Sequence, residues 1–533
     1  MTGRQPKPIL KAIAAALSLV TLGTPAFSAY AVQHDAPYLA LAKENYRQWI
    51  QQNTQIDRKL VALQQRFKKR PNIIYILTDD IGWGELGWQG GGKHRGTPSP
   101  ELDKMAFEGM RFWAAYAEPS CTPTRIALNT GRHPVRTGML SVLWPGQPEG
   151  LSPKEVTIAE VLKKAGYETA MWGKWHLGEL ETYAPENQGY DYAYYGLYNG
   201  APYAWPDAAK MYQGKSPPGS AMFYDFPGEK QYKKVTGVRL SPGFYEGHKG
   251  GKRKPVHEVS QQGLVEFESE SARQLITWVR AKARSDKPFF IYWASYAQQV
   301  AGVPEYQHKA YVDARNAQSS FMLRHNRHVR SLLETLLELK IAQNTLVIWY
   351  SDNGPMYGFW PTAGYSWLRG AKGDVYEGGV RVPAMAWWPG MIAPNQDPVD
   401  MIHVTDLYTT AARIAGAMTY IPSDRVVDGI DQTPLLLLGE GHGRRNYMFH
   451  YSGPFLQAVR WDNFKLHIKP RGPPVEVYNI MRDPGEKHGK LYSYSFTVTP
   501  FQNLVKNHKL MIRKYPHRVS RITPPGAAIT PHD

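Results

Sequence analysis

From Pro71 onward, short apolar runs alternate with stretches of helical periodicity, and this alternation constrains the fold more than any other feature of the chain. Strands alternating with helices are typical of an α/β fold with a mostly parallel central sheet flanked by helices. In such a sheet, ligands bind outside the carboxyl ends of the strands. We therefore expect the polar residues that follow the apolar runs to converge on one crevice. The four clearest runs are residues 72–78, 168–172, 288–293 and 345–350.

Two of these runs end in a pair of residues whose side-chain oxygens commonly bind metal ions, called metal-type side chains below. Asp79 and Asp80 follow the first run, and Asp352 and Asn353 follow the fourth. Such residues commonly occupy turns after strands, and either pair alone would favour that interpretation. Two pairs at equivalent strand ends would repel each other unless a cation lay between them. Because all the donor atoms are oxygens, the set predicts a hard divalent ion, Ca²⁺ or Mg²⁺, over zinc.

The single cysteine, Cys121, stands in a Cys-x-Pro-x-Arg motif at the start of a predicted short helix that Gly131 can end. A lone cysteine is ordinarily a small buried hydrophobic residue. Here Pro123 fixes the first helical turn without losing a needed donor, and Arg125 adds a permanent forked charge. A helix N-terminus and a guanidinium both favour a tetrahedral oxyanion. The motif therefore predicts a sulfate or phosphate site around Cys121.

Three further side chains are candidates for the same site. Lys174 and His176 flank Trp175 after the second run, so on an extended segment they point to the same side. Lys372 lies in a glycine-rich segment, 370–379, where the backbone can approach a ligand closely. Taken singly, a hydrogen-bonded structural histidine and a solvated loop lysine are the ordinary interpretations. Their significance depends on the pattern that they form with the other motifs.

Together these segments resemble the type I sulfatases, the formylglycine-dependent, arylsulfatase-like family of the alkaline phosphatase superfamily. The resemblance runs from about Pro71 into the C-terminal region. It implies an alkaline phosphatase-like fold and a sulfuric ester hydrolase in which a separate maturing enzyme oxidises Cys121 to Cα-formylglycine. The hydrated aldehyde would then be the nucleophile. The matching segments are residues 72–84, 121–132, 173–178, 351–354 and 372–383.

The resemblance also implies a role for each matching residue. Arg125 would orient the modified side chain, and Lys174 and Lys372 would bind the sulfate oxygens. His176 would be the base that takes a proton from the hydrate and so releases sulfate. One Ca²⁺ would be held by residue 121 together with Asp79, Asp80, Asp352 and Asn353.

One departure from the family pattern concerns the proton donor for the leaving group. Many relatives carry a Pro-His step after the third run, whereas this chain has Gln298 and Gln299 there. Glutamine cannot act as an acid. Lys372, or a histidine elsewhere that binds the substrate, such as His308, would then supply the proton. Alternatively, the substrate would have a good leaving group such as a phenol. A third interpretation is that the enzyme has lost much of its rate.

Two alternatives to a sulfatase remain open at this point. A phosphodiesterase or phosphonate hydrolase of the same superfamily would use a similar site, because a phosphoryl group is also tetrahedral. A non-catalytic sulfoglycan-binding protein would fit the missing histidine and the basic charge of +17, which reflects 63 basic against 46 acidic residues. We expect no nucleic-acid partner, because no docking motif or base-stacking pattern accompanies this charge.

The N-terminal region predicts export. Residues 1–31 combine a cationic start, an apolar run and small residues, as in a cleavable signal peptide, and no later segment approaches a transmembrane length. A periplasmic or secreted protein follows. Residues 39–67 then carry a heptad stripe that predicts a long amphipathic helix. Packing along the protein's own body and self-association are equally compatible with this stripe.

The remaining expectations concern domain organisation. A helical extension over 32–70 precedes a catalytic domain over 71–440, in which residues 196–263 have the composition of long loops. Residues 441–533 resemble the small antiparallel C-terminal subdomain of sulfatases. Its predicted strands are residues 448–451, 456–460, 465–468 and 476–479.

Overall fold

The computed structural model of the chain places most residues that follow the predicted signal peptide. That peptide, residues 1–31, lies outside the described residues, as do Gln298, Gln299 and His308. The described residues are 32–143, 147, 149–200, 243–257, 261–297, 317–356, 364–468, 476–490 and 492–518.

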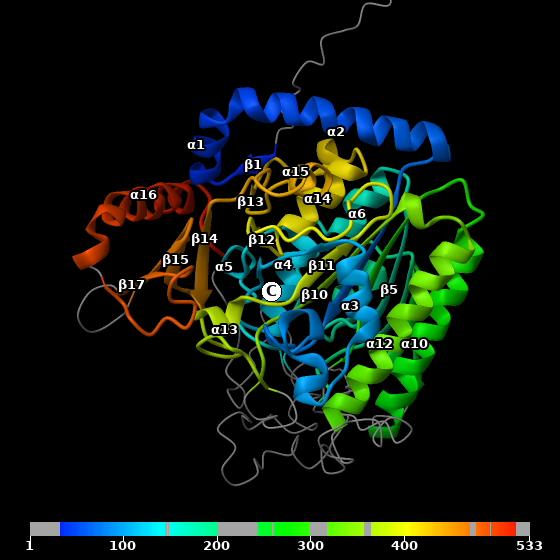
Figure 1. The fold of residues 1–533 in the computed structure, drawn as a ribbon. Coiled ribbons are helices and arrows are strands. Elements are labelled where there is room, and N and C mark those ends of the chain that lie inside the picture. The colour runs from blue at the N-terminus through cyan, green and yellow to red at the C-terminus, as the bar shows by residue number, and fades with distance from the viewer. Residues whose placement is uncertain are drawn as a thin grey trace, which may run out of the picture.

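A nine-stranded sheet forms the centre of the molecule (Figure 1). Its five middle strands, from β10 to β6, run parallel, and on each side two further strands continue the sheet, each paired antiparallel with the strand before it. The four predicted runs are the neighbouring strands β10, β2, β9 and β5, so the expected α/β fold is confirmed. The order is β3 (Met110–Arg111), β11 (Ala384–Trp387), β10 (Thr345–Ser351), β2 (Asn72–Thr78), β9 (Phe289–Ala294), β5 (Glu168–Lys174), β6 (Tyr192–Gly196), β7 (Phe244–His248) and β8 (Lys254–His257).

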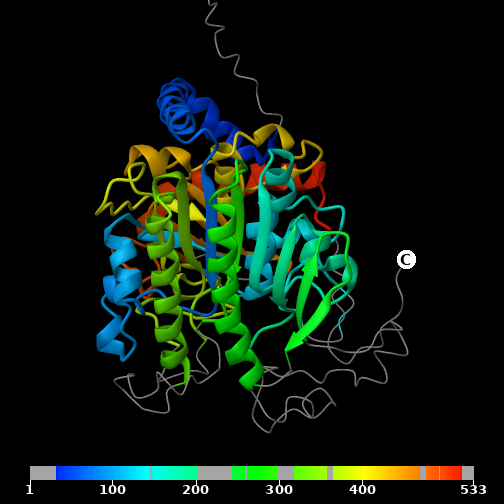
Figure 2. The ribbon, with the colours of Figure 1, turned by 90° about the vertical axis from the view of Figure 1, so that its right-hand side faces the viewer.

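Helices cover both faces of the sheet. Because successive side chains of a strand point to opposite faces, each strand contributes to two cores. In β2, Ile74 and Ile76 pack into one core, and Tyr75 and Leu77 pack into the other. Helices α3 (Pro100–Phe107), α10 (Gln261–Lys282) and α12 (Ala317–Glu338) cover the first face, and Figure 2 shows α10 and α12 lying over the strands. The second face packs against α4 (Cys121–Thr130), α6 (Ile158–Lys164) and α14 (Asp406–Ile414).

Short elements connect these layers. Two small parallel pairs join β4 to β12 and β1 to β13. Their bounds, with those of the short helices, are β1 (Gln33–His34), β4 (Ala114–Tyr116), β12 (Met401–His403), β13 (Val426–Val427), α5 (Pro134–Thr137), α13 (Glu377–Val380) and α15 (Thr433–Leu438). The segment predicted as loops contains the hairpin β7–β8, which extends the sheet, while residues 201–242 lie outside the described residues.

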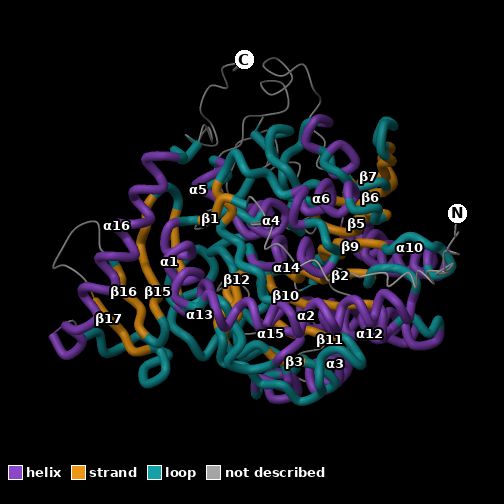
Figure 3. The backbone as a smooth tube through the Cα atoms, turned by 90° about the horizontal axis from the view of Figure 1, so that it is seen from above, coloured by secondary structure: helices purple, strands orange, loops and turns teal. Residues whose placement is uncertain are grey.

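The heptad stripe forms two helices where one was expected, α1 (Ala36–Glu44) and α2 (Tyr46–Phe67). Asn45 separates them: its φ of −97° and ψ of 11° depart from helical values, and its side-chain amide donates to the Leu41 carbonyl at 2.9 Å. This side-chain bond competes with helix continuation, as is usual for asparagine. Figure 3 shows α1 beside α16 (Val498–Lys514), with α2 running on toward the opposite side of the molecule.

The apolar stripe of α2 packs against the protein's own body. Ile56 and Leu63 are buried in the main core, next to α15. Asn53, the polar break in the stripe, accepts a hydrogen bond from the Arg444 guanidinium at 2.6 Å, and that guanidinium also lies 4.9 Å from the ring of Trp49. Internal packing therefore uses the stripe, and self-association stays a prediction for the remaining exposed side chains.

This packing predicts a difference between two substitutions in α2. Ile56→Ala should lower the free energy of unfolding by about 2–4 kcal/mol, because it leaves a cavity in the core. Val61 is 51% exposed, so Val61→Ala should change the free energy of unfolding by less than about 0.5 kcal/mol. Urea unfolding of both variants measures this contrast. Equal effects, or a change of oligomeric state with Val61→Ala, would contradict internal packing as the main use of the stripe.

The C-terminal region contains the predicted antiparallel sheet. Its strands are paired in chain order and lie close to the predicted positions. Helix α16, which was not predicted, packs against β15. No helix within the described residues is both long and apolar enough to cross a membrane. The strands are β14 (Tyr447–Ser452), β15 (Phe455–Trp461), β16 (Phe464–His467) and β17 (Glu476–Asn479).

Candidate active site

The predicted short helix around the cysteine is confirmed. Helix α4 begins at Cys121, and Gly131 ends it in the left-handed conformation with a φ of 68°. The Cys121 side chain is fully buried, and its Sγ lies 3.7 Å from an Asp79 carboxylate oxygen. The cysteine therefore lies at the carboxyl end of β2, where the first metal-type pair begins.

In-register pairing of β10 and β2 brings the two predicted pairs together. Ser351 is opposite Thr78, so the residues that follow them are neighbours. The Asp80 N–H donates to Asp352 Oδ1 at 3.1 Å, and the Asn353 side-chain amide donates to Asp80 Oδ1 at 2.7 Å. One ligand atom from each member of a four-residue cluster lies within 4.8 Å of the others: Asp79, Asp80, Cys121 and Asp352.

The donor set of this cluster fits a hard cation. All its carboxylates are buried, and Asn353 Oδ1 has no hydrogen-bond partner within the described part of the chain. Burial and the neighbouring Asp79 raise the pKa of Asp352 to about 6, a sign of mutual repulsion that a divalent ion would offset. The three aspartates and the Asn353 amide oxygen are ligands of the kind that Ca²⁺ prefers.

Arg125 connects the two acidic strand ends. Its guanidinium is fully buried and donates to Asp352 Oδ2 at 2.8 Å and to Asp79 Oδ2 at 3.4 Å. The other Nη donates to the Lys174 carbonyl at 3.1 Å and lies 3.4 Å from the Tyr292 hydroxyl. The forked side chain thus fixes α4 to the ends of three central strands and compensates two buried carboxylates.

Two lysines place positive charge beside the cysteine. Lys174 Nζ forms a buried ion pair with Asp79. Lys372 Nζ lies 2.6 Å from Asp80 Oδ1 and 2.9 Å from Cys121 Sγ. Although burial alone would raise the pKa of Asp79, the charges of Lys174, Arg125 and Lys372 lower it. Both lysines are therefore positioned to neutralise an anion at residue 121.

Within the described part of the chain, one ring nitrogen of His176 is hydrogen-bonded and the other is not. Its Nε2 lies 2.8 Å from the Leu143 carbonyl, which can only accept, so this nitrogen carries the proton. The other nitrogen, Nδ1, has no hydrogen-bond partner among the described residues. Burial, reinforced by Lys174, holds the pKa of His176 well below its usual value. The neutral ring therefore presents a lone pair on Nδ1. The backbone φ of His176 is 58°, in the left-handed region, which is a strained conformation often found at functional sites.

Two threonines that were not predicted hold the site together. The Thr122 hydroxyl donates to the His176 carbonyl at 3.0 Å and accepts from the Leu143 N–H at 3.2 Å. The Thr124 hydroxyl bonds the Asp352 carbonyl and fixes the start of α4 to β10. Their position inside the cysteine motif was the available signal. The predicted His308 and the departure at Gln298 and Gln299 lie outside the described residues.

The fold and this centre define a class of protein, a hydrolase acting on an anionic ester. A buried carboxylate cluster, two lysines and an arginine surround one side chain at the carboxyl edge of a parallel sheet. The sulfatase family profile matches residues 71–417. The chain is 34% identical over 412 residues to N-acetylgalactosamine-6-sulfatase from Mus musculus, covering 75% of this chain and 72% of that protein.

Two further comparisons agree. Arylsulfatase A from Homo sapiens is 32% identical over 464 residues, covering 79% of this chain and 83% of that protein. The crystal structure of the PsFucS1 sulfatase from Pseudoalteromonas sp. superposes with a TM-score of 0.78 at 31% identity, covering 88% of this chain and 95% of that one. The chain belongs to the sulfatase family, and it is an enzyme that hydrolyses sulfate esters.

Proposed function

We propose that this sulfatase releases inorganic sulfate from a carbohydrate sulfate ester through a formylglycine derived from Cys121. The observation that carries the proposal is the position of Cys121 Sγ, 2.9 Å from Lys372 Nζ and 3.7 Å from Asp79 Oδ1. Residue 121 thus lies between a cationic side chain and a metal-type cluster. The similarity to N-acetylgalactosamine-6-sulfatase supports a sugar as the alcohol, with an aryl sulfate as the alternative substrate.

The unmodified thiol is poorly suited to be the nucleophile. Burial raises the pKa of Cys121 to about 12, so the reactive thiolate is scarce at neutral pH. Formylglycine, once hydrated, supplies two hydroxyls, one to attack sulfur and one to allow sulfate to be eliminated afterwards. Conversion of Cys121 requires a maturing enzyme, which we propose as a partner together with export to the periplasm or the exterior.

The other side chains would bind and orient the sulfate group. Lys174 and Lys372 are positioned to hold its oxygens and to offset the negative charge that develops as the S–O bond breaks. Arg125 would hold the carboxylates and residue 121 in fixed positions relative to one another. His176, which is neutral and whose Nδ1 has no partner among the described residues, would take the proton during release of sulfate. Protonation of a sugar leaving group would fall to Lys372 or to a histidine such as His308.

We propose Ca²⁺ as the ion of the acidic cluster. It would supply Lewis-acid stabilisation of a sulfate oxygen next to residue 121. Its oxygen ligands would come from Asp79, Asp80, Asp352 and Asn353.

Removal of this ion should abolish activity reversibly. Dialysis against a Ca²⁺ chelator is expected to lower kcat by at least about 100-fold, because Asp79 and Asp352 then repel each other and the charge stabilisation is lost. Added Ca²⁺ should restore the rate, and Mg²⁺ should restore less of it, because its smaller shell demands stricter geometry. Full activity in protein shown by mass spectrometry to be metal-free would contradict the assignment.

The role of His176 predicts a particular pH profile. A base acts when neutral, and the pKa of His176 lies well below 6.5, so activity should persist as the pH falls through 6.5 and decline only further down. His176→Ala should lower kcat by about 10²–10⁴-fold. The exposed His248 provides the matched control, and His248→Ala should leave kcat unchanged. If kcat fell to half as the pH was lowered to 6.5, or at a higher pH, His176 would be excluded as this base.

The proposal as a whole is tested by mass and by rate. The peptide containing residue 121, from protein matured in its native host, should be lighter by about 18 Da, the difference between thiol and aldehyde in the cysteine oxidation chemistry. A 6-O-sulfated hexosamine, an aryl sulfate and an aryl phosphodiester should then be compared by kcat/KM. Preference for the aryl sulfate would replace the sugar by a phenol, and an unmodified Cys121 in active enzyme would overturn the formylglycine mechanism.

A further inference from the structure

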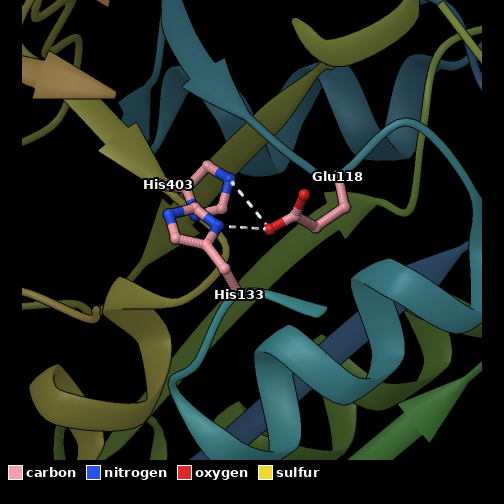
Figure 4. Close-up of side chains that lie close together, drawn as sticks. All are labelled: Glu118, His133 and His403. Carbon is pink, nitrogen blue, oxygen red and sulfur yellow. Dashed lines mark hydrogen bonds and ion pairs between the residues drawn. The ribbon is translucent and has the colours of Figure 1, made fainter. Parts of the chain in front are cut away.

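Three buried side chains next to the catalytic helix form a second cluster of metal-type ligands. Glu118 lies just before α4, His133 lies just after it, and His403 ends β12 (Figure 4). Glu118 Oε1 lies 2.7 Å from His133 Nδ1 and 3.9 Å from His403 Nε2. One ligand atom from each residue lies within 4.8 Å of the other two. Figure 4 shows the carboxylate directed at both imidazole rings.

The charges around this cluster leave room for a cation. Arg136 is paired with Asp428 and Asp35, and Arg445 is paired with Asp406. With Glu118, four carboxylates therefore face two guanidinium groups. Although burial lowers it, the charges of Asp428 and Glu118 raise the pKa of His133, so without a metal a proton on His133 offsets part of this charge. A divalent ion on Glu118 would take the place of that proton and leave both imidazoles neutral, which is the form that binds metals.

His403 provides an independent sign of a missing ligand. Its Nε2 is buried and has no hydrogen-bond partner among the described residues. Its Nδ1 lies 2.9 Å from the Thr405 hydroxyl and accepts a hydrogen bond from the Thr405 backbone N–H at 3.3 Å. Binding of a metal at Nε2 requires the other tautomer, in which Nδ1 carries the proton and donates it to the hydroxyl, and Nε2 then carries a lone pair on the side of Glu118. Metal-bound histidines are commonly held by such a bond from their other nitrogen.

We propose that Glu118, His133 and His403 bind a zinc ion, distinct from the ion of the catalytic cluster. Two imidazole nitrogens and one carboxylate are a common zinc ligand set, with a fourth position for water. In a tetrahedral zinc site the ligand atoms lie about 3.3 Å apart, given bonds of about 2.0 Å, and the observed 2.7 and 3.9 Å bracket that value. Calcium, in contrast, selects oxygen ligands.

Such an ion would fix both ends of the helix that carries residue 121. The Glu118 N–H donates to the Thr124 hydroxyl at 3.1 Å, so its position is coupled to the first turn of α4. His133 follows the end of the same helix, and His403 belongs to the neighbouring pair β4–β12. Zinc would therefore join three segments that position the catalytic residue without taking part in the reaction.

The test uses full-length Cys121→Ser protein, so that no thiol can bind zinc, with excess Ca²⁺ to fill the acidic cluster. After dialysis against zinc, mass spectrometry should find about one zinc per chain, and X-ray absorption should show two imidazole ligands. Cobalt in place of zinc should give the visible spectrum of a tetrahedral site. These readouts need no substitution in the cluster itself, so they stand even where a cluster variant fails to fold.

Variants then assign the site. Glu118→Gln and His403→Asn, each added to Cys121→Ser, should weaken zinc binding by on the order of 100-fold or more. The control is His450→Asn, because His450 is also a buried histidine whose Nε2 has no hydrogen-bond partner in the described part of the chain. It should bind zinc normally. Absence of zinc from the Cys121→Ser protein, or binding that Asp80→Asn removes and Glu118→Gln does not, would overturn the proposal.

Discussion

Replacing Cys121 by alanine is expected to abolish sulfate release, with a loss in kcat of roughly 10⁴-fold or more. The substitution removes the side chain from which the nucleophile is made, and Asp80, which Lys372 also contacts, belongs to the carboxylate cluster that we propose binds Ca²⁺. The fold should persist, because the change removes one sulfur atom and leaves the ion pairs of Arg125 and Lys174 in place. Turnover of a sulfate ester, together with circular dichroism and thermal unfolding, measures both statements.

Cys121→Ser provides the matched comparison. Serine has one hydroxyl, whereas the hydrate has two, so attack on sulfur remains feasible and elimination of sulfate does not. We expect a single turnover that leaves a mass gain of about 80 Da, that of SO₃, on residue 121 as a stable covalent product. Multiple turnovers by either variant would show that residue 121 is not the nucleophile.

Arg125→Ala should cause the largest loss of stability, about 3–5 kcal/mol in the free energy of unfolding. The guanidinium is fully buried and is paired with Asp352 at 2.8 Å, so its removal leaves a buried carboxylate without its partner. The loss should be larger in a Ca²⁺ chelator than in Ca²⁺, because a bound cation would partly replace the missing charge. Denaturant unfolding in both conditions measures the difference.

Two companion variants separate charge from geometry. Arg125→Lys keeps the charge but loses the fork that also reaches the Lys174 carbonyl, so it should be less destabilised than the alanine variant. The double variant Arg125→Ala with Asp352→Asn should recover part of the stability, because the unpaired carboxylate is gone. Equal stability of the single and double variants would mean that the buried charge is not the cause.

The meeting of the polar residues around Cys121 was largely predictable because these residues occupy the ends of strands or the start of a helix. Asp79, Asp80, Asp352 and Asn353 follow apolar runs whose length and composition predicted strands, and parallel neighbours end at the same edge. The role of Arg125 as a link between two carboxylates was less accessible. It depends on distances across segments more than 200 residues apart.

The C-terminal strands were predicted within a few residues, because each is a short apolar run bounded by turns. The break at Asn45 was not predicted, since a heptad pattern continues through it while a local side-chain hydrogen bond ends the helix. The own-body packing of α2 was likewise undecided, because a stripe records that a face is apolar but not what covers it.

The sequence by itself determined the α/β class, the family and the set of polar residues that we propose as the catalytic centre, because periodicity and motif spacing are local properties of the chain. Only the tertiary structure decided that Asn353 Oδ1 and His176 Nδ1 have no hydrogen-bond partner among the residues that it describes, and that Glu118, His133 and His403 meet around α4. The physical reason is that burial, hydrogen-bond satisfaction and charge balance arise from contacts between segments far apart in the chain. Such contacts leave no pattern in the neighbouring residues.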